Sequence, residues 1–247
     1  MSPAAGSPVA TRLRVVSYNL HSLRDDRRAL VATVRDLAPD VLLLQEAPRR
    51  LRWRSRSAAL ARAFGLVVAA GGRPAAGNLI LTDMRVAVRR AWSRRWPVAG
   101  RPVRGAALAR CEVAGAPFVA VGAHLSTAAV QRPPQARLLR QAVSGLDAPA
   151  VLGADVNDLP GSAAWQALTT GLVDGGATAG GDGAPTFPSD HPRRRIDAVF
   201  VDPWIEVDTY RVVDSPLARR ASDHLPVVAD LRLSTAGAGG QERVGEE

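Results

Sequence analysis

The chain has 247 residues, of which 47% are hydrophobic and 22% are charged. These proportions exclude a disordered chain and allow one large domain or two small ones. No apolar run approaches the roughly 18–20 residues of a transmembrane helix, and no signal-peptide pattern is visible at the start. The single cysteine, Cys111, cannot form an internal disulfide. We therefore expect a soluble, cytoplasmic monomer.

The charge of the chain is strongly basic, with a formal net charge of +9 at pH 7. All 32 basic residues are arginine and none is lysine. One interpretation is a polyanionic partner such as nucleic acid, whose phosphates must be neutralised. The other is a GC-rich genome that shapes codon choice. The net charge alone leaves both interpretations open.

The predicted elements alternate between strands and helices along the chain. Apolar and β-branched runs predict strands, and apolar residues at helical spacing predict helices. In chain order we expect strand 13–18, helix 26–37, strand 40–44, helix 53–64, strands 66–69, 78–82, 85–92, 106–113 and 118–123, helix 134–143, strand 151–153, helix 162–169, and strands 196–201, 205–213 and 225–233.

Domain boundaries follow from composition. Residues 1–11 are small and polar and are expected to form a flexible arm, and residues 234–247 a disordered tail. No long linker divides residues 12–233, which we interpret as one domain. Roughly ten strands in adjacent runs, with helices at intervals, favour two sheets packed face to face with helices outside.

Polar side chains that could carry chemistry lie at the ends of the apolar strands. An isolated Asn or Asp after a strand is usually a turn former or a helix cap, so each alone is weak evidence. Together they would form one acidic, histidine-lined pocket, and carboxylate and amide oxygens favour Mg²⁺ or Mn²⁺. These residues are Asn19, Gln45, Glu46, His124, Asp155, Asn157, Asp197, Asp223 and His224.

Seven short segments occur in an order that resembles the endonuclease/exonuclease/phosphatase superfamily. The segments, between Ser17 and Leu231, are SYNLHSL, DVLLLQEAP, GNLILTD, GAHLST, GADVNDLPGS, RRIDAVFV and ASDHLPVVADL. The resemblance implies an α/β four-layer sandwich, in which two mixed β-sheets pack face to face and are flanked by helices. It also implies a phosphoesterase that uses Mg²⁺ or Mn²⁺.

The substrate is left open by the resemblance, because fold membership does not choose a substrate. Hydrolysis of phosphodiester bonds in nucleic acid is the leading interpretation. The alternatives are a phosphatase or phosphodiesterase acting on inositol phosphates or phospholipid head groups, and a catalytically inactive scaffold that binds polyanions.

The resemblance also implies roles for the matched residues around a metal. Glu46 resembles the main metal-binding carboxylate, Asp223 a further one, and Asn19 a partner that orients or ligates the metal and phosphate. Asp155 resembles the carboxylate that positions and deprotonates the attacking water. Asn157 resembles an amide that binds phosphate.

Two histidines complete the implied machinery. His224 resembles an imidazole that faces the phosphate and stabilises negative charge as the cation, with Asp197 as the acid that orients it. His124 is interpreted as a group that protonates or hydrogen-bonds the leaving oxygen.

Arginines near these motifs are candidate substrate-binding residues. Arg194 and Arg195 directly precede Asp197 and are expected at the pocket mouth, and Arg104 could clamp a phosphate. Arg104 could instead cover a sheet edge. The arginines that follow Glu46 could form a basic rim or simply a solvated helix start.

Overall fold

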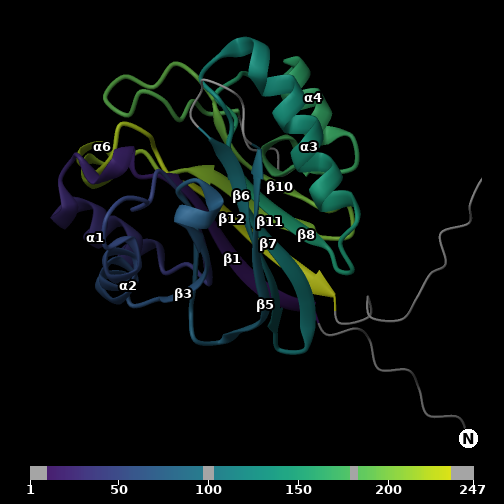
Figure 1. The fold of residues 1–247 in the computed structure, drawn as a ribbon, viewed down its shortest axis with the longest axis horizontal. Coiled ribbons are helices and arrows are strands. Elements are labelled where there is room, and N and C mark those ends of the chain that lie inside the picture. The colour runs from purple at the N-terminus through teal and green to yellow at the C-terminus, as the bar shows by residue number, and fades with distance from the viewer. Residues whose placement is uncertain (1–9, 97–102, 179–182, 235–247) are drawn as a thin grey trace, which may run out of the picture.

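The computed structural model describes residues 10–96, 103–178 and 183–234, coloured along the chain in Figure 1. Residues 1–9 and 235–247, most of the expected arm and tail, lie outside this part. The expected boundaries differ slightly, because Ala10 already pairs with Ser234 between two antiparallel strands. No helix among the described residues is long and apolar enough to cross a membrane.

The first sheet has six strands in the order β11-β12-β1-β2-β4-β3. It is mixed, because β1 and β2 are parallel whereas the other neighbours are antiparallel. Its strands are β1 (Ala10–Asn19), β2 (Val41–Gln45), β3 (Val67–Gly72), β4 (Asn78–Thr82), β11 (Glu206–Val212) and β12 (Val227–Ser234).

The second sheet also has six strands, in the order β5-β6-β7-β8-β10-β9. Here β7 and β8 are the parallel pair. Its strands are β5 (Val86–Trp96), β6 (Arg104–Val113), β7 (Ala116–His124), β8 (Ala150–Asp155), β9 (Val173–Asp174) and β10 (Asp197–Val201).

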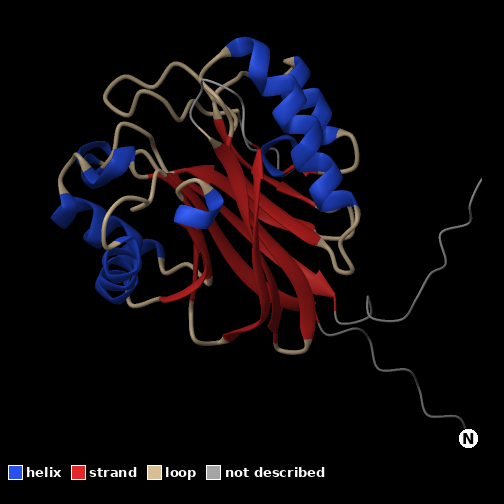
Figure 2. Cartoon of the chain, viewed as in Figure 1, coloured by secondary structure: helices blue, strands red, loops and turns tan. Residues whose placement is uncertain are grey.

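Helices cover the two outer faces of the paired sheets, as Figure 2 shows. The helices are α1 (Arg27–Leu37), α2 (Trp53–Phe64), α3 (Arg132–Ser144), α4 (Ala163–Thr169), α5 (Gly175–Thr178) and α6 (Pro216–Ala221). Three apolar clusters hold the layers together: one between the sheets, one beneath α1 and α2, and one beneath α3 and α4. The expected four-layer sandwich is therefore confirmed.

The close approach of the two sheets depends on small side chains. A Cβ atom on Gly153 of β8 would lie 2.7 Å from a methyl carbon of Leu43 in β2. Glycine at this position lets the middles of the two sheets meet, because it adds no atom between them. This contact places the ends of β2 and β8 near each other.

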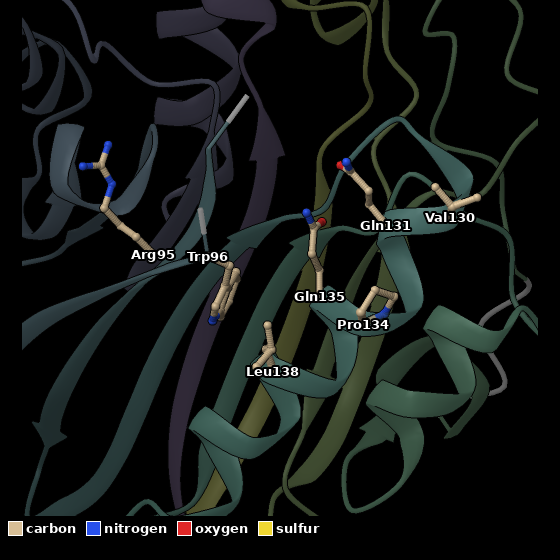
Figure 3. Close-up of a pocket in the computed structure, with 7 residues that line it drawn as sticks. All are labelled: Arg95, Trp96, Val130, Gln131, Pro134, Gln135 and Leu138. Carbon is tan, nitrogen blue, oxygen red and sulfur yellow. The ribbon is translucent and has the colours of Figure 1, made fainter. Parts of the chain in front are cut away.

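A shallow hollow of about 310 Å³ lies between the end of β5 and α3 (Figure 3). Its lining is mostly apolar, with Trp96 beside Leu138, and also includes Arg95 and two glutamines. Among the described residues, no carboxylate or histidine lines it. It therefore offers a surface for a flat apolar group but no acid–base chemistry.

Candidate active site

The two parallel strand pairs end at one edge of the sandwich and deliver the polar residues there. Asn19 of β1 pairs in register with Gln45 of β2, so Glu46 follows directly at this edge. In the second sheet, Asp155 of β8 lies opposite His124 of β7 on one side and Asp197 of β10 on the other. Ligands commonly bind at the carboxyl ends of strands in such sheets.

Asp155 lies at the centre of the cluster and is 1% exposed. One carboxylate oxygen accepts a hydrogen bond from the Asn19 amide at 2.8 Å, and the other accepts one from the backbone N–H of Asn157 at 3.0 Å. Burial raises the pKa of Asp155, and the nearby Asp197 raises it further, whereas His124 and His224 lower it.

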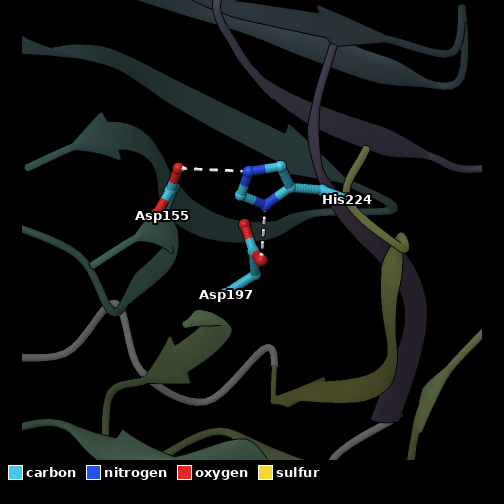
Figure 4. Close-up of side chains that lie close together, drawn as sticks. All are labelled: Asp155, Asp197 and His224. Atoms are coloured by element: carbon cyan, nitrogen blue, oxygen red, sulfur yellow. Dashed lines mark hydrogen bonds and ion pairs between the residues drawn. The ribbon is translucent and has the colours of Figure 1, made fainter. Parts of the chain in front are cut away.

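His224 is held on one side by Asp197 (Figure 4). Its Nδ1 lies 2.8 Å from the Oδ2 atom of Asp197, which also accepts a hydrogen bond from the Thr186 hydroxyl at 2.6 Å. Although burial opposes the charged form, Asp197 and Asp155 raise the pKa of His224 to about 10. The ring is therefore an imidazolium at neutral pH, and its Nε2–H points towards Asp155 at 4.0 Å.

His124 has the opposite environment. Arg104 Nη1 lies 3.1 Å from its Nδ1, and the Asn157 amide nitrogen lies 2.9 Å from its Nε2. The Arg104 donor facing Nδ1 disfavours an imidazolium, which is itself a donor at that atom, whereas Asp155 Oδ2 lies 3.2 Å from Nε2 and favours the charged form. Burial is the larger effect, and the pKa of His124 falls to about 3 despite the neighbouring Asp155.

These contacts bear on two of the expected roles. The lowered pKa of His124 favours the hydrogen-bonding alternative over the acid that protonates a leaving oxygen. The Asn157 amide nitrogen already contacts His124 and donates to the Leu125 carbonyl at 3.1 Å. Asn157 therefore positions His124 and does not offer a free N–H to a phosphate.

The opposite charge states of the two imidazoles can be measured. In protein with ¹⁵N-labelled histidine and EDTA, we expect His224 to give imidazolium shifts and His124 neutral shifts from pH 5 to 8. Because the pKa of His224 is raised, its ring should stay doubly protonated up to about pH 10. Because the pKa of His124 is lowered, its ring should stay neutral down to about pH 3. His124→Asn and His224→Asn assign the signals. A midpoint near pH 6.5 for either ring would contradict the assignment.

Glu46 and Asp223 each keep a carboxylate oxygen that could bind a divalent cation. Within the described part of the chain, only one Glu46 oxygen has a hydrogen bond, from the Ser22 hydroxyl at 2.7 Å. The Asp223 Oδ1 atom is buried without a hydrogen-bond partner, 3.9 Å from His224 Nε2. Hard oxygen donors with unused lone pairs fit Mg²⁺ or Mn²⁺. Asn19 orients Asp155 through its amide nitrogen, and its Oδ1 accepts from the backbone of His21 at 3.0 Å.

A second set of candidate metal ligands lies in the same cluster. One atom each from Asp155, Asp197 and His224 fall within 4.8 Å of one another. His224 Nδ1 faces Asp197, so the ring could offer a lone pair to a metal only through Nε2, after that atom loses its proton. We interpret these three residues as a proton-holding unit, and Glu46 and Asp223 as the other candidates for the metal.

The three candidate arginines have different locations. Arg104 reaches the cluster through His124, and burial lowers its pKa although Asp155 and Glu46 act against this. Arg194 is exposed on the loop before β10. Arg195 is buried, and its guanidinium forms two hydrogen bonds of 2.8 and 2.6 Å with Asp174. The expectation that Arg195 lies at the pocket mouth is therefore wrong, because its charge is neutralised inside the fold.

The buried location of Arg195 predicts a loss of stability on substitution. Arg195→Gln leaves the Asp174 carboxylate buried without its partner, and removing one member of a buried ion pair costs about 3–5 kcal/mol. Arg194→Gln is the matched control, because the same change one residue earlier affects an exposed side chain. Urea unfolding followed by circular dichroism measures both. Equal midpoints for the two variants would contradict the structural role.

Several contributors to the site were not predicted from the sequence. Thr186 donates to Asp197, and the Phe187 ring packs on the His224 ring with centroids 4.8 Å apart. Ser222 donates to the Asn19 carbonyl at 2.7 Å, and Ser22 binds Glu46. Ser222 is the first residue of the SDH motif and could have been noticed. Thr186 lies in a Gly/Pro-rich segment without periodicity.

The chain is similar to known proteins in sequence and in fold. The model of the Endonuclease/Exonuclease/phosphatase family matches residues 16–224. No curated protein sequence matches the chain. Among solved structures, a family protein from Bacteroides thetaiotaomicron superposes with a TM-score of 0.73 and 20% identity, covering 91% of this chain and 98% of that one.

Two further similar structures are a complex with DNA and a phosphatase. Danio rerio TDP2 complexed with a single-strand DNA product has a TM-score of 0.72 and 18% identity, over 90% of this chain and 99% of that one. A mannosyl-6-phosphatase from Bacteroides thetaiotaomicron has a TM-score of 0.71 and 19% identity, over 89% and 99%. These likenesses show the shared fold. The family match extends over most of the sequence and over every residue of the cluster, and the chain therefore belongs to the endonuclease/exonuclease/phosphatase family.

Proposed function

We propose that this chain hydrolyses phosphodiester bonds in nucleic acid with the help of Mg²⁺ or Mn²⁺. Its family consists of hydrolases that act on phosphoester bonds. The observation that carries the proposal is the buried Asp155 carboxylate, which lies between the imidazolium of His224 and the neutral ring of His124. Such pairs of titratable groups with opposed pKa shifts commonly mark acid and base roles.

Asp155 acts as the base for the attacking water. Burial raises its pKa and makes it a better proton acceptor than an exposed aspartate. The hydrogen bonds from Asn19 and from the Asn157 backbone fix its two oxygens, so its orientation does not depend on the substrate. A fixed carboxylate also reduces the entropy cost of positioning water.

His224 supplies the positive charge. Its Nε2–H makes no hydrogen bond and lies between carboxylate oxygens of Asp155 and Asp223, at 4.0 and 3.9 Å. A phosphoryl oxygen placed there would accept this proton donor while negative charge develops. Asp197 keeps the ring protonated and fixes its direction. His124 contributes hydrogen bonding only.

The charge balance of the site indicates why a cation is needed. Three carboxylates, Asp155, Asp197 and Asp223, lie within 4.0 Å of the single imidazolium of His224. An anionic phosphodiester would be repelled by this surplus. Glu46 and Asp223 would hold the divalent cation, which neutralises charge and polarises the phosphoryl oxygen.

A substrate panel tests the proposal. The purified chain is incubated with Mg²⁺ or Mn²⁺ and DNA, RNA, sphingomyelin, inositol phosphates or bis-p-nitrophenyl phosphate, with Asp155→Asn as the inactive control. We expect metal-dependent cleavage of nucleic acid and of the model diester. Cleavage of inositol phosphates or sphingomyelin alone would overturn the substrate assignment. Binding without turnover would indicate a polyanion-binding scaffold.

A further inference from the structure

Four arginines line one small hollow beside the catalytic cluster. The hollow has a volume of about 270 Å³ and is lined by Arg49 and Arg50 after β2, Arg73 after β3, and Arg95 near the end of β5, together with Ala76 and Val103. No carboxylate lines it, and none of the four guanidinium groups forms an ion pair with a residue in the described ranges.

The convergence of these charges is built into the fold. Gly77, at a φ of +96°, allows the stem of Arg49 to pass, because a Cβ there would lie 3.2 Å from the Arg49 Cδ atom. Arg49 also donates to the Ala76 carbonyl at 3.4 Å. Like charges held together repel one another, and an anion bound among the four would relieve this repulsion. The planar fork of arginine fits phosphate oxygens best.

The hollow adjoins the candidate active site. Arg49 follows Glu46 by three residues, and the backbone of the intervening Ala47 is bonded to Gly77 at 2.9 Å. Arg95 pairs in register with Gly105, next to Arg104. Arg49 is also close enough to lower the pKa of both Arg104 and His124 by its charge. One substrate can therefore reach both places.

We propose that this arginine hollow binds a second phosphate group of the substrate, adjacent to the phosphate that is hydrolysed. The inference rests on the proposed function and narrows it to substrates with at least two phosphates. A nucleic-acid strand is the favoured source. Arg95 also lines the apolar hollow of Trp96, on the other side of the strand (Figure 3). An aromatic surface next to a phosphate site fits a nucleobase, which stacks on such rings.

Binding in EDTA tests the hollow separately from catalysis. The probe is a fluorescein-labelled oligothymidylate, measured by anisotropy with wild type, R73Q/R95Q, and the control R62Q/R137Q, which loses the same charge from exposed positions outside the hollow. We expect R73Q/R95Q to weaken binding about 10–100-fold, the range for lost hydrogen bonds to charged groups. In a plot of the logarithm of the binding constant against the logarithm of the salt concentration, the slope should become less steep by about 0.7, which is the contribution of one phosphate of a single strand. Equal weakening in both variants would overturn the proposal.

Two further experiments test the arginine hollow, one by measuring catalysis and the other by competition for binding. With bis-p-nitrophenyl phosphate, which has one phosphate, R73Q/R95Q should keep kcat/KM within about twofold of wild type. A large loss there would overturn the proposal by indicating damage to the catalytic site. If wild type does not turn over any substrate, the proposed function fails while the EDTA measurement still decides on the hollow. Inositol hexakisphosphate that displaces the oligonucleotide from wild type but not from R73Q/R95Q would support the phosphate site and extend it to small polyphosphates.

Discussion

Glu46→Gln should reduce kcat/KM for a phosphodiester by about a thousandfold or more at saturating Mg²⁺. A bound cation stabilises transition-state charge by several kcal/mol, and each 1.36 kcal/mol is tenfold in rate. The amide keeps an oxygen that can accept the Ser22 hydrogen bond, so the fold should survive. The charge that would attract the cation is removed.

Two measurements separate loss of the metal from loss of the fold. Mn²⁺ binding by calorimetry should disappear in Glu46→Gln, whereas the thermal midpoint in EDTA should stay close to that of wild type. Glu112→Gln is the matched control, because the Glu112 carboxylate lies on β6, away from the cluster, where it pairs with Arg89 of β5. Full turnover of wild type in excess EDTA, or unchanged Mn²⁺ binding by Glu46→Gln, would contradict the metal site.

Elements with local signals were predicted well from the sequence. The helix 53–64 and the strand 78–82 have the predicted bounds. The helix ends where Gly65 adopts a positive φ of +79°, which glycine tolerates without strain. The strand is a continuous buried run between two turns. In both cases neighbouring residues alone determine where the element begins and ends.

The convergence of the site was also predictable, because it follows from strand ends. Asn19, Glu46, His124 and Asp155 all follow apolar strands, and the parallel pairs of the two sheets bring these ends to one edge. Their protonation states were not predictable. The opposite pKa shifts of the two histidines depend on burial and on partners that are distant in sequence, such as Arg104.

Other features depended on contacts that sequence spacing does not reveal. Arg195 is one of three consecutive arginines, and only its pairing with Asp174, 21 residues away, distinguishes it from Arg194. The short helix α6 was missed although its signals were present. Ser215 caps its first turn by accepting from the backbone of Ala218 at 3.1 Å, and Pro216 occupies the first helical position.

Asp197 and His224 should behave as one coupled unit in catalysis. His224→Ala removes the group that stabilises transition-state charge, and a loss of about 10²–10⁴-fold in kcat/KM is the usual scale for such groups. Asp197→Ala leaves the imidazole in place but removes the carboxylate 2.8 Å from its Nδ1. Its loss should be large but smaller, and the double variant should cost little more than His224→Ala alone.

The pH profile of kcat/KM distinguishes this coupling from a purely structural role of Asp197. In wild type the imidazolium should persist up to about pH 10, so kcat/KM should not fall as pH rises through the neutral range. Without Asp197 the pKa of His224 loses its main support while burial still lowers it, so activity of the variant should already decline below pH 7. Thr186→Val, which removes only the hydroxyl bound to Asp197, should keep the wild-type profile with a modest loss. Each variant must first be shown to be folded. Additive losses in the double variant, together with an unshifted pH profile for Asp197→Ala, would refute the coupled pair. An acid that only supports the strand cannot affect the proton on the His224 ring.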